Sequence, residues 1–388
     1  MSDREAVIVG VAEAELVEGR LPPGGTVLSD QAAVAAAALA EGGLTLADVD
    51  GLCTAASWGV PGPGVMPTLA LAEYLGLAPR WFDSTNVGGS SFEVHVGHAA
   101  RAIEAGDCEV VLIVYASRQR SQRSRTLAGR AGVLNLQFES PYGLPSPVGA
   151  YALAAQRHMH QYGTTSEQLA EIAVAARAWA RLNPAATRRE PLSVADVLAS
   201  PWVCEPLHVL DCCLVTDGAG AVVMTSAAHA RTLGAPAVFV RGFGEAETHL
   251  SIAAMPDLTV TPAATSARRA LDVAGLSLDD VDVAEIYDSF TITVLLTLES
   301  IGFCGPGEGG AFVSRGRIAP GGAMPMNTNG GGLSFAHPGM YGIFLLVEAV
   351  RQLRGSAGER QVDGARVALV NGTGGVLSST GTCLLCAA

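Results

Sequence analysis

A histidine in a glycine-rich loop is the residue of this chain best placed to do chemistry. His337 lies in residues 327–342, which read NTNGGGLSFAHPGMYG. Glycines let the backbone approach a ligand closely, and Pro338 restricts the residue before it to extended conformations, so the loop holds the imidazole in a defined place. A neutral imidazole there can donate a hydrogen bond to a substrate oxygen. The alternative is a structural histidine whose hydrogen bonds are satisfied within a glycine-rich turn.

The elements around this loop occur twice in the chain. Residues 38–50 read ALAEGGLTLADVD and residues 270–282 read ALDVAGLSLDDVD, with eight identities in thirteen aligned positions. Each copy is predicted to contain the C-terminal end of a helix. Ser29 and Thr261 are good N-caps for these two helices. Each helix stops at a glycine and is followed by a short strand.

A second helix and strand complete each half. Residues 91–106 and 109–116 (EVVLIVYA) form this pair in the first half, and residues 341–355 and 366–371 form it in the second. Apolar, β-branched runs of this kind suit a sheet that is covered on both faces. The sequence therefore predicts two related α/β halves in a five-layered α/β/α/β/α body, in which the central helices of the halves meet.

The domain boundaries follow from the repeat. The first half is expected to comprise residues 1–116 and 203–245, and the second half residues 246–388. Residues 117–202 have no counterpart in the second half. They are expected to form an inserted loop domain over the active site, because long insertions in compact domains commonly carry function.

The composition excludes several classes of function. The net charge is −13, so we expect no binding to nucleic acid and no insertion into membranes. The chain has no lysine, which excludes Schiff-base chemistry and lysine-dependent phosphate loops. Its eight cysteines are scattered without paired CxxC motifs, and the first residues do not form a signal peptide. We therefore expect reduced thiols, a cytoplasmic location and no metal site.

Over essentially its whole length the chain resembles the thiolase superfamily. The duplicated halves, the AHPGMYG loop, the NGTGG turn (371–375) and the DGAGAVVM segment (217–224) occur in the family's order. Residues 161–174 (QYGTTSEQLAEIAV) and 285–304 (EIYDSFTITVLLTLESIGFC) are similar to the sterol-carrier-protein-X type of thiolase. The resemblance implies the duplicated thiolase fold. It also implies that a coenzyme A thioester is the substrate and that no cofactor is tightly bound.

Of the catalytic set that the resemblance implies, only the histidine is present. Thiolases carry a nucleophilic cysteine at the start of the first half's central helix, and Asn86 or Val87 occupies that position. Asn371 stands where the family has its second cysteine. Tyr287 stands where the family has the asparagine of its NEAF motif. His337 matches the histidine of the family's GHP loop.

Further residues are expected to contact the substrate. Asn86 and Asn371 are candidates to donate hydrogen bonds to the thioester, and Ser334 and Gly372 belong to the two glycine-rich motifs that surround it. The two asparagines could instead fill the space that the absent cysteines leave. The arginine-dense segment 118–130 is a candidate for the phosphates of coenzyme A, with a solvated loop or an acidic partner surface as alternatives. The arginines proposed for this role are Arg118, Arg123 and Arg125.

Without a thiolate the chain cannot hold an acyl group covalently. An oxyanion site alone still stabilises a thioester enolate. Retro-aldol cleavage of a β-hydroxyacyl thioester then needs only a base for the hydroxyl proton and an acid for the enolate. Tyr287 and Tyr341, the latter four residues after His337, are candidates for these roles. Asp288 is expected to cap the helix that follows it.

This pattern resembles the lipid-transfer-protein-type aldolases of steroid side-chain breakdown, which lack the cysteines and act with a small OB-fold/zinc-ribbon partner. The leading hypothesis is therefore retro-aldol cleavage of a β-hydroxyacyl-CoA. The alternatives are a thiolase (acetyl-CoA acyltransferase) or ketoacyl synthase with an unorthodox nucleophile, and an inert acyl-CoA-binding or scaffold subunit. The resemblance also implies a homodimer across the first half's sheet edge, a role for which the strand at 109–116 is suitable.

Overall fold

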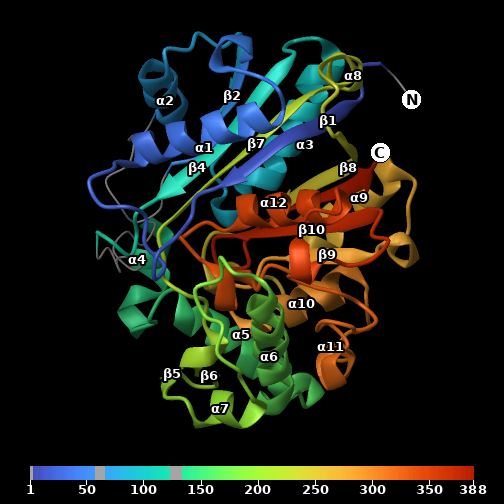
Figure 1. Cartoon of the computed structure of the whole chain (residues 1–388). Coiled ribbons are helices and arrows are strands. Elements are labelled where there is room, and N and C mark those ends of the chain that lie inside the picture. The colour runs from blue at the N-terminus through green and yellow to red at the C-terminus, as the bar shows by residue number, and fades with distance from the viewer. Residues whose placement is uncertain (1–2, 57–65, 123–132) are drawn as a thin grey trace.

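The computed structural model describes residues 3–56, 66–122 and 133–388. In this part of the chain nine strands form one sheet in the order β3-β2-β4-β7-β1-β8-β11-β10-β9. β1 and β8 pair only through Val7 with Phe239 and Ile8 with Val238, so the sheet divides there into two halves (Figure 1). The strands are β1 (Ala6–Glu13), β2 (Gly51–Cys53), β3 (Trp81–Asp83), β4 (Val110–Ser117), β7 (Gly218–Ser226), β8 (Val238–Glu247), β9 (Val283–Ile286), β10 (Val367–Gly374) and β11 (Ser379–Ala387).

Two helices lie between the two halves of the sheet. α3 (Ser91–Ala105) and α12 (Gly342–Leu353) contact each other and strands of both halves. α12 reads GIFLLVEAVRQL and is buried along nearly its whole length, as a helix covered on two sides must be. α1 (Val27–Glu41) covers the outer face of β1, β4 and β7, and α9 (Ala263–Ala274) covers β8 and β11. The predicted five-layered duplicated α/β fold is confirmed.

The repeated segments take the same structure in both halves. α1 leads into β2 and α9 leads into β9. α9 ends at Gly275 in the left-handed conformation, and the Thr261 hydroxyl accepts a hydrogen bond from the Ala263 N–H. The N-cap of α1 is Thr26 rather than the predicted Ser29. The reason is a capping box, in which the Thr26 and Ser29 side chains each accept the other's backbone N–H.

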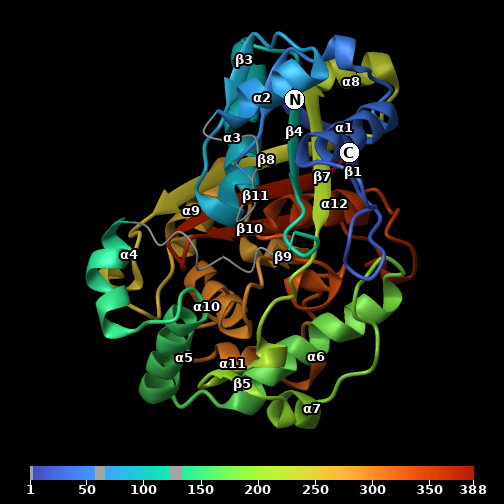
Figure 2. The same ribbon diagram turned by 90° about the vertical axis from the view of Figure 1, so that its left-hand side faces the viewer.

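A group of helices lies between β4 and β7 in the sequence and packs on the side of the second half. Figure 2 shows them below the strands, next to α10 (Thr291–Ile301) and α11 (Gly309–Val313). α6 contacts the glycine-rich segment Gly331–Phe335, so this group borders the loop that carries His337. Its elements are α4 (Val133–Phe138), α5 (Val148–Tyr162), α6 (Ser166–Leu182), α7 (Val194–Ala199), β5 (Trp202–Cys204) and β6 (Leu207–His208). The remaining helices are α2 (Pro67–Leu75) and α8 (Ala227–Leu233).

The edge of the first half is not the strand that we expected. β4 lies between β2 and β7, so the expectation that residues 109–116 form the edge is wrong. The two short parallel strands β2 and β3 extend the sheet beyond β4, and they carry too few residues to be recognised beside the long apolar run. β3 is the edge strand, and its Phe82 is 60% exposed.

None of the helices in residues 3–56, 66–122 and 133–388 combines the length and the apolar character that a membrane span needs. Over the same residues the structure holds no group of three or more His, Cys, Asp or Glu side chains that could bind a metal ion.

Candidate active site

Three aromatic side chains meet where the two halves join. Tyr287 follows β9, and its N–H donates to the carbonyl of Asn371 on β10 at 2.9 Å. Its hydroxyl lies 3.0 Å from Nε2 of His337 and accepts the N–H of Tyr341 at 3.1 Å. The Tyr341 hydroxyl in turn donates to Oδ1 of Asn329 at 2.8 Å. The structure thus brings together the three residues that were expected to act on the substrate.

The His337 loop is held from the first half of the chain. The His337 N–H donates to the Thr216 hydroxyl at 2.9 Å, and the Thr216 N–H donates to the His337 carbonyl at 3.2 Å. The Tyr115 hydroxyl on β4 donates to the carbonyl of Pro338 at 2.8 Å. A Cβ at Gly218 would lie 2.8 Å from the Pro338 ring, so β7 approaches the loop closely. Strands of the first half therefore position a histidine of the second.

Asp288 supports the glycine run of the same loop. Its carboxylate accepts the N–H of Gly332 at 2.6 Å and the N–H of Leu333 at 3.1 Å. Gly331 has a φ of +63°, and a Cβ there would lie 2.0 Å from Oδ2 of Asp288, so only glycine fits. The expectation that Asp288 caps the next helix is wrong: α10 has Phe290 as its N-cap, with no side-chain capping bond.

Burial keeps these groups neutral near pH 7. It lowers the pKa of His337 to about 4, so the imidazole is uncharged. It raises the pKa of Tyr287 and of Tyr341 well above that of a free phenol. Burial also raises the pKa of Asp288 to about 7, an effect that its two backbone N–H donors oppose. The site therefore presents two phenols and an imidazole that are neutral at rest, and these can donate or accept hydrogen bonds to a substrate without a buried charge.

Comparison with known proteins identifies the family. The model of the Thiolase C-terminal domain-like family matches residues 244–387. The chain is 34% identical to the 17-hydroxy-3-oxo-4-pregnene-20-carboxyl-CoA lyase of Mycobacterium tuberculosis, over 96% of its own length and 98% of that protein. It belongs to the thiolase superfamily.

Two further relatives lie in the same branch of the superfamily. This thiolase-superfamily chain is 33% identical to the steroid side-chain-cleaving aldolase of Thermomonospora curvata, over 87% of its own length and 88% of that protein. The solved structure of the Ltp2-ChsH2(DUF35) aldolase superposes with a TM-score of 0.88 at 31% identity, covering 100% of this chain and 99% of that one.

The turn that the resemblance assigns to the thiolase nucleophile is open. Asn86 is exposed there, and its side-chain oxygen accepts the N–H of Gly88 at 3.3 Å. Gly89 packs against the ring of Tyr287, where an added Cβ would lie 2.3 Å from Cε2. In the described part of the chain no side-chain hydrogen bond joins Asn86 to the three aromatic residues. Its expected hydrogen bond to a thioester therefore stays a prediction.

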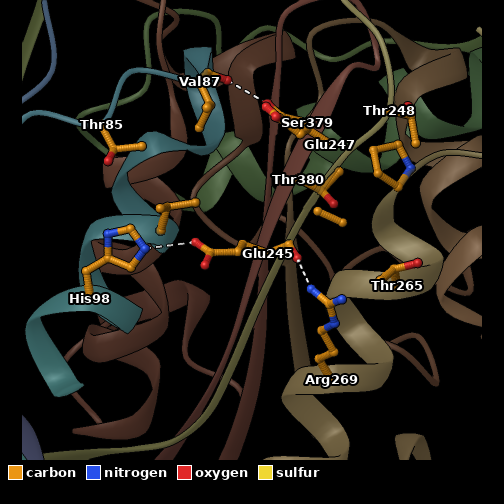
Figure 3. A pocket seen from close by; sticks show the side chains of 13 residues that line it. Thr85, Val87, His98, Glu245, Glu247, Thr248, Thr265, Arg269, Ser379 and Thr380 are labelled. Atoms are coloured by element: carbon orange, nitrogen blue, oxygen red, sulfur yellow. Dashed lines mark hydrogen bonds and ion pairs between the residues drawn. The ribbon is translucent and has the colours of Figure 1, made fainter.

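A charged pocket of about 590 Å³ opens on the other side of this turn, between α3, β8, α9 and β11. Val87 lines it, and Figure 3 shows His98 of α3 pointing to Glu245 of β8. His98 lies 2.6 Å from the Asp83 carboxylate and 3.0 Å from that of Glu245. The hydrogen bond to Asp83 is the main cause that raises the pKa of His98 to about 9. Tyr287, His337 and Tyr341 are not among the residues that line this pocket, so it is separate from the aromatic site.

Two residues of the NGTGG turn face other groups than expected. The Asn371 amide donates to the Thr382 hydroxyl at 2.7 Å, and Thr382 bonds to Ser266 on the outer helix α9. The Asn371 side chain therefore lies on the outer face of β10, because successive side chains of a strand alternate. Gly372 faces the central helices, and the Glu93 carboxyl fills the space above it. Neither placement favours a contact with the substrate.

Ser334 and Arg118 are engaged in structural contacts. The Ser334 hydroxyl accepts from Nε of the buried Arg177 at 2.9 Å. Arg118 is 4% exposed and donates to the Asp30 carboxylate at 2.6 and 2.8 Å and to the carbonyl of Pro22 at 2.9 Å. Because Arg118 is buried and paired with a carboxylate, these contacts differ from those expected of an arginine that binds a phosphate. Arg123 and Arg125 lie outside the described residues.

Three participants were not expected from the sequence. Thr216 holds the backbone of His337, Asn329 accepts the Tyr341 hydroxyl, and Glu93 lies behind the aromatic residues. Asn329 lies in the NTNGGG run, so the sequence offered it as a candidate polar residue of the site. Thr216 and Glu93 come from distant segments, and only the folded chain places them here.

Proposed function

We propose that this protein cleaves the Cα–Cβ bond of a β-hydroxyacyl-CoA of the steroid or lipid side-chain type by a retro-aldol reaction. The observation that carries the proposal is the hydrogen-bonded group of Tyr287, His337 and Tyr341, two of which stand at positions that the resemblance assigns to the thiolase active site. The helix entrance beside it reads NVGGSS, with no cysteine. The names of the two relatives, a lyase and a side-chain-cleaving aldolase, support the same chemistry.

The proposed step needs no covalent intermediate. The β-hydroxyl loses its proton to a base, its C–O bond becomes the carbonyl of a ketone or aldehyde, and the Cα–Cβ electrons pass into the thioester as an enolate. An acid then returns one proton to Cα, so that protons balance. The products are the carbonyl compound and a shorter acyl-CoA.

The hydrogen bonds favour Tyr287 as the base and Tyr341 as the acid. Burial raises the pKa of Tyr287, so its phenol is protonated near pH 7 and must release its own proton as it takes that of the β-hydroxyl. The neutral imidazole of His337 can accept the phenol proton when Nε2 carries none, because Nε2 lies 3.0 Å from the Tyr287 oxygen. The Tyr341 N–H donates to the same oxygen and stabilises the negative charge that develops on it. Once Tyr341 has given its proton to the enolate, transfer of the His337 proton to Tyr341 restores both neutral groups. The Tyr341 hydroxyl has a single acceptor in Asn329 and keeps its proton until the enolate forms.

The cysteines support a reaction without a thiolate. All eight are free. Burial raises the pKa of Cys213 and of Cys383 well above the usual thiol range, and it raises that of Cys212 to about 12. A thiol that is protonated near pH 7 is a weak nucleophile. This argues against the thiolase and ketoacyl synthase alternatives.

The proposal extends to partners and location. We propose a coenzyme A thioester as substrate with no tightly bound cofactor, a cytoplasmic location, and a small OB-fold/zinc-ribbon partner. The solved aldolase that resembles this chain is named as a complex, Ltp2-ChsH2(DUF35), which supports such a partner. A homodimer is proposed at β3, whose exposed Phe82 lies near the exposed Leu69 of α2. Residues 117–202 are proposed as the domain that covers the site.

The test is turnover of a β-hydroxyacyl-CoA that bears a tertiary alcohol, with and without the partner protein. We expect a ketone and a shorter acyl-CoA, and a loss of at least about a hundredfold in kcat for Tyr287→Phe. Tyr142→Phe is the matched control, because Tyr142 is 86% exposed. No cleavage by the wild-type protein under either condition would refute the proposal.

A further inference from the structure

Glu93 is a buried carboxyl that the proposed reaction does not use. It is the third residue of α3 and is 1% exposed. Among the described residues neither of its carboxyl oxygens has a hydrogen-bond partner. A Cβ at Gly372 would lie 2.1 Å from its Oε2, and a Cβ at Gly342 would lie 2.6 Å from the same oxygen. Glycines on β10 and α12 thus leave just enough room for this carboxyl.

This carboxyl adjoins both contacts that place Tyr287. Gly342 directly follows Tyr341, whose N–H donates to the Tyr287 hydroxyl at 3.1 Å. Gly342 also packs on Gly89, since an added Cβ would lie 2.3 Å from the Gly89 carbonyl oxygen. Gly89 in turn packs on the Tyr287 ring. A movement of the first turn of α12 therefore shifts Tyr287 from two sides.

We propose that Glu93 is a positioning residue whose protonated carboxyl keeps the first turn of α12 in place, and whose ionisation displaces the Tyr341 N–H from the Tyr287 hydroxyl. The first N–H groups of a helix have no intrahelical acceptor, and a negative charge nearby attracts them. A Glu93 carboxylate would accept hydrogen bonds from these groups and draw the turn toward α3. The effect on the reaction rests on the proposed function of Tyr287.

Glu93 differs from the other titratable groups of this region because its pKa lies just above neutral pH. β11 contributes Cys383, whose thiol donates to the Glu93 carbonyl. α12 and β10 approach the carboxyl through Gly342 and Gly372, which have no titratable side chain. Within the described residues no arginine or histidine pairs with it. Burial raises the pKa of Glu93 to about 8. The two phenols of the aromatic site and the Cys383 thiol titrate well above their usual ranges, and Asp288 titrates at about 7.

The first test is the pH dependence of β-hydroxyacyl-CoA cleavage for the wild-type protein and for Glu93→Gln, which keeps the shape and removes the charge. We expect the wild-type rate to fall roughly tenfold per pH unit above about pH 8, and the Glu93→Gln rate to persist there. Glu104→Gln is the matched control, an exposed carboxyl on the same helix, and should follow the wild type. An unchanged alkaline limb in Glu93→Gln would overturn the inference.

The second test needs no substrate, and so separates this inference from the proposed function. A folded pKa of about 8 against an ordinary 4.5 means that the folded protein binds an extra proton between these values. Wild-type stability relative to Glu93→Gln should therefore fall as pH rises from about 4.5 to about 8, and then stay constant. Glu93→Met, another neutral side chain of similar length, gives the same comparison. A stability difference that does not change with pH contradicts the inference.

Discussion

Thr216 offers a sharp test of how the site is built. It is fully buried, and its hydroxyl accepts the His337 N–H at 2.9 Å. Thr216→Val keeps the shape of the side chain and the backbone bond to the His337 carbonyl, but it removes this acceptor. A buried N–H without a partner costs about 1–3 kcal/mol. We expect the free energy of unfolding to fall by about that amount, and kcat to fall about ten- to a hundredfold because His337 is less well placed.

The assay combines urea unfolding followed by tryptophan fluorescence with the rate of β-hydroxyacyl-CoA cleavage. Thr216→Ser is the control, because it keeps the hydroxyl acceptor and should retain most of the stability and activity. If Thr216→Val matched the wild type in both measurements, the hydrogen bond would not hold His337, and this description of the loop would be refuted.

Three further predictions concern the same site and its surroundings. Tyr341→Phe should lower kcat by about 10²- to 10⁴-fold with little change in KM, as expected for a residue that acts as the acid. A rise in KM with kcat unchanged would assign Tyr341 to substrate binding instead. Because burial lowers the pKa of His337 to about 4, activity should persist below pH 6 and fall only as pH approaches 4, where the imidazole gains a proton; the pH dependence of kcat/KM measures this, and a limb at 6.5 would contradict it. Arg118→Leu leaves the partly buried Asp30 carboxylate without its partner and should cost about 3 kcal/mol of stability, measured by urea unfolding, without raising KM for the acyl-CoA. A selective rise in KM would instead support a role of Arg118 at the phosphates.

The layered architecture and the meeting of the three aromatic residues were predictable from the sequence. The repeat at 38–50 and 270–282 places equivalent elements in each half, and order within a half places His337 and Tyr341 at the entrance of its central helix. These relations depend on helix caps, turns and chain order, which can be recognised without knowledge of packing. Tyr287 joins the other two residues only through the family resemblance, as the residue at the position of the NEAF asparagine. The catalytic roles themselves stay predictions.

The orientation of single side chains was not predictable. Asn371 and Gly372 are neighbours on β10, and the run NGTGG offers no apolar alternation that shows which face is inward. The bond from Asn371 to Thr382 depends on the register of β10 with β11. Glu93 lies on a helix that also carries two histidines, Arg101 and Glu104, and an acidic residue on such a helix suggests a solvent-facing side. Glu93 is buried because the two halves of the sheet cover α3 on both sides. The spacing of apolar residues along a single helix does not show that a helix is covered in this way.

The most direct test of the central claim is a single turnover of a tertiary β-hydroxyacyl-CoA in D₂O, with mass spectrometry of both the products and the intact protein. A retro-aldol reaction predicts a ketone, a shorter acyl-CoA with one deuterium at Cα, and a protein of unchanged mass. An acyl group trapped on a cysteine, or no cleavage in the presence of the partner protein, would contradict the account.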